Sequence, residues 1–541
     1  MEQVLEQHTN LDALQKLVGE LVRENMQLKV ENVALLGKNS ILQEQINLLL
    51  HKRFGANSEK YRAEQSDLFN EAEVYAEETD GQDVQAESSD DTAVPSTDYA
   101  DPSSHQVDSS SVRKPGRKAL PQELPRVEII HDLPEDQRRC SEGHELKEIG
   151  TEVSEQLDII PAKVQVLRHI RKKYACPCCQ AEVKTAPLPP QPIPKSNASA
   201  GLLAYIITSK FLDALPLYRQ SKQFKRIGVD LSRSTLAFWM IRCGELIQAL
   251  CNLMQEQLCQ HPVLQMDETT LQVLKEEGKA ASSQSYLWVQ RGGPPNQPVV
   301  MFHYSPTRSQ TVADQLLQGF SGTVQTDGYA GYVGVCVKNG LQHAGCWAHA
   351  RRKFDEALKA QGKGQLKAGK ASKAIITIQK LYRIEKLIAG LPPDEKQRAR
   401  QQQAVPILNE MKEWLDTSLT QVPSTSLTGK ALTYLANQWS TLTVYCEDGR
   451  IDIDNNAVER AIRPFVIGRN NWIFSDTVKG AKASANLYSL IETAKLNGLE
   501  PYRYLQHVFK ELPKAQTLAE IEQLLPWAVD CEYINSGWNN G

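Results

Sequence analysis

The segment Pro262-Val-Leu-Gln-Met-Asp-Glu-Thr-Thr270 decides the fold of this chain. Its apolar first half, Pro262–Met266, predicts a short β-strand that ends in the acidic pair Asp267-Glu268. A second segment follows the same plan, because the predicted strand Thr323–Thr326 runs directly into Asp327-Gly-Tyr-Ala-Gly-Tyr332. Two strands that each end in an aspartate predict a cluster of carboxylates wherever those strands lie side by side.

The residues between these segments supply the rest of a sheet. Ser285–Val289 and Val299–Phe302 predict two further strands, and Thr311–Phe320 predicts an amphipathic helix. Three strands, a crossover helix and a fourth strand predict a mixed α/β sheet. In that order the first and fourth strands are neighbours, so Asp267 and Asp327 are expected at adjacent strand ends.

A third acid lies far downstream. Ile453-Asp-Asn-Asn456 is predicted to cap a helix from about Ala457 to Ile462, which carries Glu459 with Arg460 and Arg463 on neighbouring turns. Carboxylates from two strands and one helix can hold two Mg²⁺ (or Mn²⁺) ions about 4 Å apart. Such a pair activates water or a 3′-hydroxyl against a phosphodiester. The competing interpretation is that a strand-terminal aspartate is only a turn residue.

The N-terminal segment is predicted to assemble copies of the chain. Leucine recurs every seven residues at positions 14, 21, 28, 35, 42 and 49, with asparagine at 25, 32 and 39 on the adjoining position of the repeat. This pattern is typical of a parallel coiled coil, and it predicts a homodimer or a higher oligomer. The alternative is one amphipathic helix packed on its own domain.

Charge is distributed unevenly along the chain. Residues 63–112 carry 14 acidic residues and no lysine or arginine, which predicts a disordered acidic linker. A basic arm with Arg113, Lys114, Arg117 and Lys118 follows, and it is suited to a DNA minor groove or is a solvated linker. The formal net charge of −4 therefore conceals an excess of ten basic residues over residues 113–541.

A zinc-binding module is predicted after the basic arm. Cys140-x3-His144 and Cys176-x2-Cys179 are two ligand pairs with the spacing of a structural tetrahedral Zn²⁺ site. Cys178 is an alternative to Cys179, His144 is alternatively a surface residue, and buried reduced thiols are the competing interpretation. Residues 200–260 are then predicted to be helical. The helix Pro216–Phe224, the turn at Gly228 and the helix Leu236–Ile247 are compatible with a helix-turn-helix or with a plain helical connector.

Composition excludes several classes of protein. The chain has 541 residues, of which 41% are hydrophobic and 23% charged, and this predicts three or four globular domains. No apolar run approaches the roughly 18 residues of a membrane span, and no secretory signal is expected at the N-terminus. Eleven cysteines do not amount to a disulfide scaffold, so a cytoplasmic protein with a local metal site is expected.

Several blocks of sequence occur together in one order. They are Met266-Asp-Glu-Thr, Thr326-Asp-Gly-Tyr-Ala-Gly-Tyr, Cys346-Trp-Ala-His-Ala-Arg-Arg-Lys-Phe354, Asp454-Asn-Asn-Ala-Val-Glu-Arg-Ala-Ile-Arg-Pro464, Phe54-Gly-Ala-Asn-Ser-Glu-Lys60, Lys114-Pro-Gly-Arg-Lys and Pro501-Tyr-Arg-Tyr-Leu. Over nearly its whole length the chain resembles the bacterial insertion-sequence-sixty-six transposases, which are members of the Asp-Asp-Glu recombinase class.

This resemblance implies a multidomain α/β protein with a ribonuclease H-like catalytic core. It implies that Asp267, Asp327 and Glu459 are catalytic metal ligands, and that a helical insertion separates the second acid from the third. The family zinc segment commonly begins with Cys-x2-Cys, whereas this chain has Gly143 at the second position. The resemblance also implies binding of terminal inverted repeats and target DNA, together with accessory proteins of the same element.

Basic residues near the predicted acids are candidates for DNA contacts, with solvated helix faces as the alternative. They are Arg351, Arg352 and Lys353, and Arg460, Arg463 and Arg469 beside the third acid. Cys346-x2-His349 has metal-ligand spacing, but packing beside the active site is the preferred interpretation. Trp347 and Trp472 are expected in the core rather than stacked on a base.

The expected organisation follows from these segments. We expect a coiled coil at 1–60, an acidic linker at 61–112, a basic arm and zinc module at 113–195, a helical DNA-binding domain at 196–260, a first core part at 261–356, a helical insertion at 357–440, a second core part at 441–500 and a C-terminal helical segment at 501–541. The predicted function is a transposase that cuts and joins DNA strands. The rivals are a catalytically lapsed dimeric DNA-binding regulator and a plain nuclease.

Overall fold

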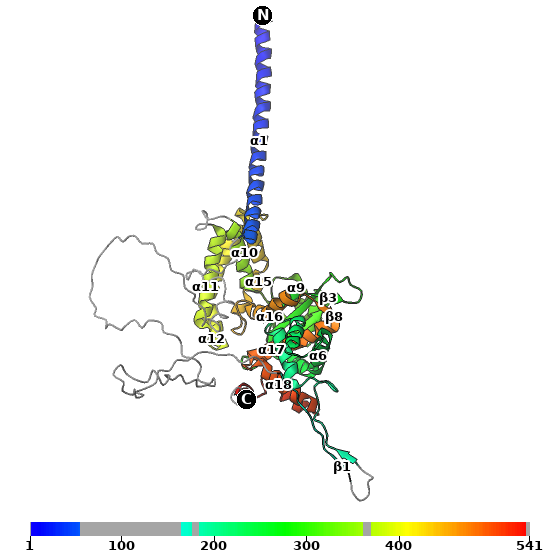
Figure 1. Ribbon diagram of the computed structural model, residues 1–541. Coiled ribbons are helices and arrows are strands. Elements are labelled where there is room, and N and C mark those ends of the chain that lie inside the picture. Colours follow the sequence, from blue (N-terminus) through cyan, green and yellow to red (C-terminus); the bar gives the residue numbers. More distant parts are fainter. Residues whose placement is uncertain (1, 55–163, 176–182, 361–368, 537–541) are drawn as a thin grey trace, which may run out of the picture. The chain divides into compact units, whose positions relative to one another are not determined.

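The computed structural model describes residues 2–54, 164–175, 183–360 and 369–536 (Figure 1). The chain divides into two compact units, one made of Met1–Gln82 with Pro190–Asn535 and one of Asp83–Pro189 with Ser536–Gly541. In the second unit, β1 (Lys173–Ala175) and β2 (Val183–Thr185) form an antiparallel hairpin. The remaining elements belong to the first unit.

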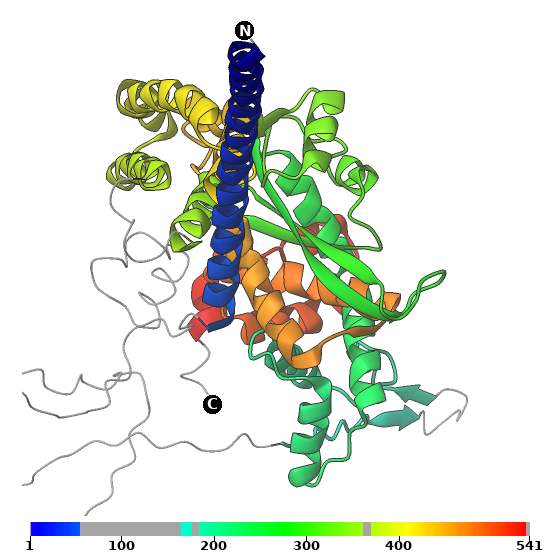
Figure 2. The same cartoon turned by 90° about the horizontal axis from the view of Figure 1, so that it is seen from above.

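A six-stranded mixed sheet organises the first unit. Its strands are β3 (Val263–Lys275), β4 (Gln284–Gly292), β5 (Val299–Ser305), β6 (Thr323–Gln325), β7 (Gln342–Ala344) and β8 (Ser475–Thr477). The strand order is β5-β4-β3-β6-β7, and β8 pairs with the far half of β3. β3, β4 and β5 are antiparallel, whereas β6 and β7 run parallel to β3. Figure 2 shows β3 and β4 as a long twisted hairpin in green.

The predicted mixed sheet is confirmed, and the fourth predicted strand does lie beside the first. The predicted end of the first strand at Met266 is wrong, because β3 continues through Asp267 to Lys275. β4 pairs with β3 from Gln265 to Gln272, so β3 keeps a hydrogen-bonded neighbour after its pairing with β6 has ended at Gln265. Asp267 therefore lies inside a strand rather than at its end.

Four helices precede the sheet: α4 (Ala200–Phe211), α5 (Leu217–Arg226), α6 (Arg233–Leu246) and α7 (Gln248–Cys259). Their starts follow the sequence signals, since Pro216 is the N-cap residue of α5 and Ser232 Oγ accepts a hydrogen bond of 3.1 Å from Thr235 N at the start of α6. Their buried side chains belong to the same hydrophobic core as the sheet. The helices therefore support the sheet as well as presenting a surface of their own.

Helix α17 (Val478–Leu496) protects the outer edge of the sheet. Ser489 Oγ accepts a hydrogen bond of 2.8 Å from Phe302 N, and Thr493 Oγ1 bonds both the N–H and the C=O of Val300 at 3.0 Å. These hydroxyl groups satisfy backbone groups of β5 that an edge strand otherwise leaves unpaired. On its other side α17 approaches α6 closely, because a Cβ atom on Gly244 would lie only 2.6 Å from Ala483.

The remaining helices complete the two sides of the sheet and the C-terminal part. They are α8 (Gln310–Leu316), α9 (Ala330–Asn339), α10 (Trp347–Ala360), α16 (Asn456–Trp472), α18 (Pro501–Glu511), α19 (Leu518–Glu522) and α20 (Cys531–Asn535). The expectation of core burial is confirmed for Trp347, which is fully buried and donates from Nε1 to Leu442 O at 2.8 Å. Trp472 is partly buried and packs against the sheet core.

A helical insertion separates β7 from α16 in the sequence. It comprises α11 (Lys370–Ile388), α12 (Pro393–Ala399), the π-helical turn η2 (Arg400–Ala404), α13 (Val405–Gln421), α14 (Leu427–Asn437) and α15 (Trp439–Leu442). Together with α10 these helices enclose a second hydrophobic core. In the described part of the predicted insertion, 357–440, these helices are joined by short non-helical links at 389–392 and 422–426.

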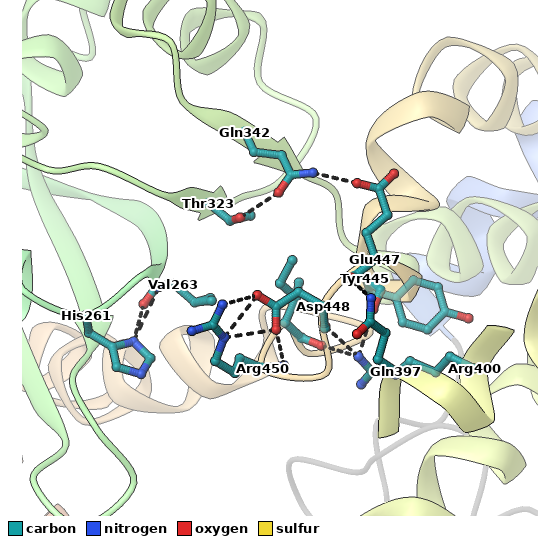
Figure 3. A network of polar contacts seen from close by, with 11 residues as sticks. His261, Val263, Thr323, Gln342, Gln397, Arg400, Tyr445, Glu447, Asp448 and Arg450 are labelled. Carbon is teal, nitrogen blue, oxygen red and sulfur yellow. Dashed lines mark hydrogen bonds and ion pairs between the residues drawn. The ribbon is translucent and has the colours of Figure 1, made fainter. Parts of the chain in front are cut away.

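Arg400 ties the insertion to the loop that leads back to the sheet (Figure 3). The side chain is 1% exposed, and its Nε and Nη2 atoms donate to Glu385 at 2.9 and 2.7 Å. Nη1 lies within 3.0 Å of the carbonyl oxygens of Tyr445, Asp448 and Ile451. In the same figure Gln342 of β7 donates to Glu447 Oε2 at 2.7 Å. The loop 445–451 is thus held from both sides.

Helix α1 (Glu2–Phe54) spans 53 residues. Along its described side chains the heptad residues Leu21, Leu28, Leu35, Leu42 and Leu49 are all more than half exposed. Within the described parts of the chain, no helix combines the length and the apolar content that a membrane crossing requires.

Replacing Arg400 with leucine should destabilise the protein strongly. The substitution leaves the Glu385 carboxylate and up to three carbonyl groups without a buried donor, and breaking such a buried pair costs about 3–5 kcal/mol. Urea unfolding of the full chain, followed by the fluorescence of its tryptophans, measures the change.

Arg450→Ala is the matched control. Arg450 pairs with Asp448 in the same loop, at 2.6 Å, but its side chain is 48% exposed, so its loss should cost under about 1 kcal/mol. Equal unfolding midpoints for the two variants would contradict the role assigned to Arg400.

Candidate active site

The pairing of β3 with β6 brings the first two predicted acids together. The strands are parallel, and Gln265 is opposite Gln325 in the last paired register position. Asp267 and Asp327 each lie two residues further along their chains. Asp267 lies on the same face of β3 as Gln265. Asp327 lies just past the end of β6, and its carboxylate is close enough to Asp267 to raise the pKa of Asp267. β6 ends at Gln325, and there its chain leaves the sheet toward α9.

Glu459 reaches the same point from the first turn of α16. Its Oε1 atom lies 3.6 Å from His349 Nε2, and its Oε2 atom lies 3.6 Å from Arg352 Nη2. Both partners belong to α10, so this helix orients the third acid. The Glu459 side chain is 28% exposed and that of Asp327 is 23% exposed, which leaves both carboxylates accessible to solvent.

The electrostatics of Asp267 report the convergence of the three acids. Burial raises the pKa of Asp267 to about 8, with further upward contributions from the carboxylates of Glu268, Glu459 and Asp327. The hydrogen bond of 2.8 Å from Glu268 N to Asp267 Oδ1 acts in the opposite direction. A cluster of acids that disfavours its own ionisation is a cluster that a cation stabilises.

Glu268 belongs to a separate, charge-compensated network. Its side chain is 2% exposed; it forms an ion pair with Arg308 and accepts a hydrogen bond of 2.5 Å from Tyr332 Oη. Burial raises the pKa of Glu268, whereas Tyr332 and Arg308 act against the rise. Arg308 also lies 3.8 Å from Asp327 Oδ2 and stacks on Tyr329, with its guanidinium carbon 4.0 Å from the ring centroid.

The donor chemistry of the three acids fits a divalent cation. Carboxylate oxygens are the ligands that Mg²⁺ and Mn²⁺ prefer in proteins. Across the described ranges, no three His, Cys, Asp or Glu side chains lie close enough together to enclose one ion.

The other residues predicted from the Cys346-x2-His349 spacing do not form a metal pair. Cys346 is buried and its Sγ accepts a hydrogen bond of 3.4 Å from Asn455 N, beside the start of α16. His349 instead faces Glu459. Burial lowers the pKa of His349, although Glu459 acts in the opposite direction.

The predicted DNA contacts have different surroundings. Arg352, Lys353, Arg460 and Arg463 are exposed, whereas Arg351 is half-buried over the Tyr382 ring. Arg469 uses its Nη1 atom within the protein, where it donates to Thr270 on β3, including Oγ1 at 2.8 Å. DNA binding by these residues stays a prediction.

The predicted zinc ligands and the basic arm lie outside the described residues. This applies to Cys140, His144, Cys176 and Cys179, and to Arg113, Lys114, Arg117 and Lys118. The ligand set and the minor-groove contacts therefore remain predictions.

Sequence reasoning missed several residues of the site. Arg308 lies 3.8 Å from Asp327 and was not singled out, and Glu268 was given no role beside Asp267. His349, which was expected to pack beside the active site, does contact Glu459. The sequence did contain a signal for the pairing of the two strands. The pattern Gln-x-Asp occurs twice, as Gln265-x-Asp267 and Gln325-x-Asp327, and the two glutamines are opposite each other in the sheet.

Comparisons with known proteins identify the family. The model described as "Transposase IS66 family" matches residues 195–483, and "IS66 C-terminal element" matches 489–527. The model for the "zinc-finger binding domain of transposase IS66" matches 137–180, and "Transposase C of IS166 homeodomain" matches 41–129. The chain belongs to the IS66 transposase family. The resemblance found in the sequence is thereby confirmed.

Relatives of this IS66 family member occur in Sinorhizobium fredii (strain NBRC 101917 / NGR234). The "Uncharacterized protein y4jD" is 34% identical over 422 residues, which cover 75% of this chain and 81% of the relative. The "Uncharacterized protein y4qI" is 34% identical over 423 residues, covering 76% and 77%. A chain of the simian T-cell lymphotropic virus intasome in complex with PP2A regulatory subunit B56 gamma matches 26% of this chain and 46% of its own at 14% identity, with a TM-score of 0.13 that is too low to bear on the fold.

Removing Arg308 should expose the dependence of buried Glu268 on its partner. Arg308→Met leaves a carboxylate that is 2% exposed without its compensating charge, so the free energy of unfolding should fall by about 3 kcal/mol. The double variant Arg308→Met with Glu268→Gln should recover most of that loss, because no buried charge is left unpaired. Urea unfolding of both variants and of Glu268→Gln completes the double-mutant cycle, and additive changes would contradict the coupling.

Proposed function

We propose that this IS66 family member is an active Asp-Asp-Glu transposase that cuts and joins DNA strands at the ends of an insertion sequence. The observation that carries the proposal is the convergence of Asp267, Asp327 and Glu459 from β3, the end of β6 and the first turn of α16. The sheet order, with three antiparallel strands followed by two parallel ones, supports a ribonuclease H-like core interrupted by a helical insertion.

The three acids would bind two divalent cations, for which we propose Mg²⁺ or Mn²⁺. The carboxylates of Glu459 and Asp327 both raise the pKa of Asp267, so Asp267 is close to each of the other two acids. This suits a ligand shared by both ions. When bound, the ions supply activation of the attacking oxygen and stabilisation of the leaving oxygen. His349 and Arg352 orient Glu459, and Glu268 holds Arg308 beside Asp327.

The chemistry consists of two displacements at phosphorus. In the first, a water oxygen attacks the phosphorus at the element end, the bond from phosphorus to the 3′ oxygen breaks, and a 3′-hydroxyl is released. In the second, that hydroxyl attacks a target phosphodiester, and a new bond to phosphorus replaces the bond to the target 3′ oxygen. Arg308 and Arg352 are 38% and 54% exposed at the margin of the acid site, so their guanidinium groups can face the phosphate oxygens.

The flanking parts would bind and pair the DNA ends. The described leucines of the α1 heptad stripe are exposed in a single chain, which supports a parallel coiled coil that pairs two copies or more. The partners proposed are terminal inverted repeats, target DNA and accessory proteins of the same element. For the structural site in the zinc module we propose one Zn²⁺ ion held by Cys140, His144, Cys176 and Cys179. A cytoplasmic location is part of the same proposal.

Asp267→Asn should abolish strand cleavage while DNA-end binding is retained. The change removes a proposed shared metal ligand without altering side-chain size, so we expect the rate of Mg²⁺-dependent cleavage to fall by on the order of a thousandfold. Cleavage and joining of end-containing DNA, measured with an electrophoretic binding assay in parallel, test this expectation.

The matched control is Asp314→Asn, an aspartate on α8 that is bonded to Lys338 and Asn339 away from the three acids. It should cleave at the wild-type rate. Wild-type cleavage by Asp267→Asn would disprove the catalytic assignment, and a wild-type chain that binds ends without cutting them would favour the lapsed regulator. Cleavage without joined products would favour a plain nuclease.

Zinc content should depend on the second cysteine pair. Cys176→Ser should reduce bound zinc from about one ion per chain to well below one, because a tetrahedral site loses affinity with a missing ligand. Cys178→Ser and Cys179→Ser, measured by the same metal analysis, decide which of the two is the ligand. Cys531→Ser, an exposed cysteine of α20, is the control that should retain zinc; unchanged zinc in Cys176→Ser would remove that residue from the ligand set.

A further inference from the structure

Two glutamines occupy equivalent buried positions beneath the acids. Gln265 and Gln325 are 4% and 0% exposed, they face each other across the parallel pair β3–β6, and each precedes a catalytic aspartate by two residues. Gln265 and Asp267 therefore share one face of β3, and Asp327 follows just past the end of β6. Burying two amide side chains is costly unless their hydrogen bonds are made, so this pair is a feature that requires an explanation.

The first glutamine connects both strands to the loop before α16. Gln265 Nε2 donates to Gln325 Oε1 at 2.9 Å. The same nitrogen lies 3.2 Å from Asp452 Oδ2 and 3.3 Å from Asp454 O. Residues 452–454 directly precede the helix whose first turn carries Glu459. One amide group thus links β3 and β6 to the origin of the third acid.

The second glutamine extends the link to α10. Gln325 Nε2 donates to Asp452 O at 2.6 Å and to Gly345 O at 3.2 Å. Gly345 lies just before α10, and Trp347 N in turn donates to Ile453 O at 3.2 Å. His349 and Arg352, which contact Glu459, are on α10. The two amides therefore join all four segments that carry or orient the acids.

The arrangement is more specific than stability requires. Gln265 Oε1 has no hydrogen-bond donor among the residues that the structure describes, so the pair is buried at a cost that apolar side chains would avoid. The 452–454 loop directly follows residues 445–451. That segment is held by Arg400, which contacts the carbonyl oxygens of Tyr445 and Asp448 (Figure 3). Without the glutamines, the segment before α16 would keep its contacts with the insertion, β7 and α10 but would lose these hydrogen bonds to β3 and β6.

We infer that Gln265 and Gln325 are positioning residues that set Glu459 at the correct separation from Asp267 and Asp327 for cation binding. The inference rests on the proposed function in so far as these acids are the metal ligands. It predicts that the amides govern the response to the cation rather than DNA binding or folding.

The test compares Gln325→Leu, Gln265→Leu and the double leucine variant with Gln290→Leu. Gln290 is a matched control, because it is 0% exposed in β4 of the same sheet and donates to Leu316 O at 3.0 Å. Among the described residues it forms no hydrogen bond to the 452–454 loop. Two quantities are measured on the full chain: the Mg²⁺ concentration that gives half-maximal cleavage, and the rise in Tm on adding Mn²⁺ without DNA.

The single and double variants should need at least about tenfold more Mg²⁺ for half-maximal cleavage, which corresponds to about 1.4 kcal/mol. Their Mn²⁺-dependent rise in Tm should shrink, while DNA-end binding is unchanged. The double variant should be at least as stable as the single ones, because neither strand then presents an unpaired amide. Gln290→Leu should lose stability but respond to both ions as the wild type does.

A double variant that folds and keeps the wild-type response to both ions would overturn the inference, and so would an equal shift in Gln290→Leu. Failure of the proposed function is distinguishable. If the wild-type chain cuts no DNA, the proposed function fails, and the rise in Tm with Mn²⁺ still tests the role of the glutamines. If the wild-type chain binds no Mn²⁺, the inference is overturned as well.

Discussion

The parallel pairing of β3 with β6 is the constraint on which the rest of this structure depends. It covers only three register positions and ends with Gln265 opposite Gln325. A slip by one residue would turn every side chain of β6 to the other face and separate Asp327 from Asp267. The antiparallel partner β4 continues past this point along β3. Asp267 is therefore in a regular, paired strand at the place where β6 ends.

Elements outside the sheet, together with one side chain each from β3 and β6, bring Glu459 to this pair. The insertion fixes the loop 445–451 through Arg400, α10 contacts the Glu459 carboxylate, and the buried amides connect that loop to both strands. The insertion has its own hydrophobic core. A large helical insertion can therefore lie between the second and third acids in the sequence without disturbing the site. The polar contacts hold the segment before α16 against β3 and β6, although the insertion separates them in the chain.

Charge compensation divides the acids into two groups. Glu268 is buried and fully engaged by Arg308 and Tyr332, which makes it part of the scaffold. Asp267 has no comparable ion pair among the described residues, and its pKa is raised to about 8. Adjacent residues in one sequence motif thus have opposite roles, because one side chain faces an arginine and the other faces two carboxylates.

The sequence by itself determined four of the strands and the pairing of the first with the fourth, together with the helical insertion, the family and the three acids that we propose as catalytic. These follow from local apolar patterns and from short blocks that survive as contiguous motifs. Only the tertiary structure decided that β3 continues past Asp267, that Glu268 is neutralised by Arg308, and that two glutamines contact a loop 127 to 189 residues further along the chain. Such contacts join residues distant in the chain, and their partners depend on register and packing, which no local pattern encodes.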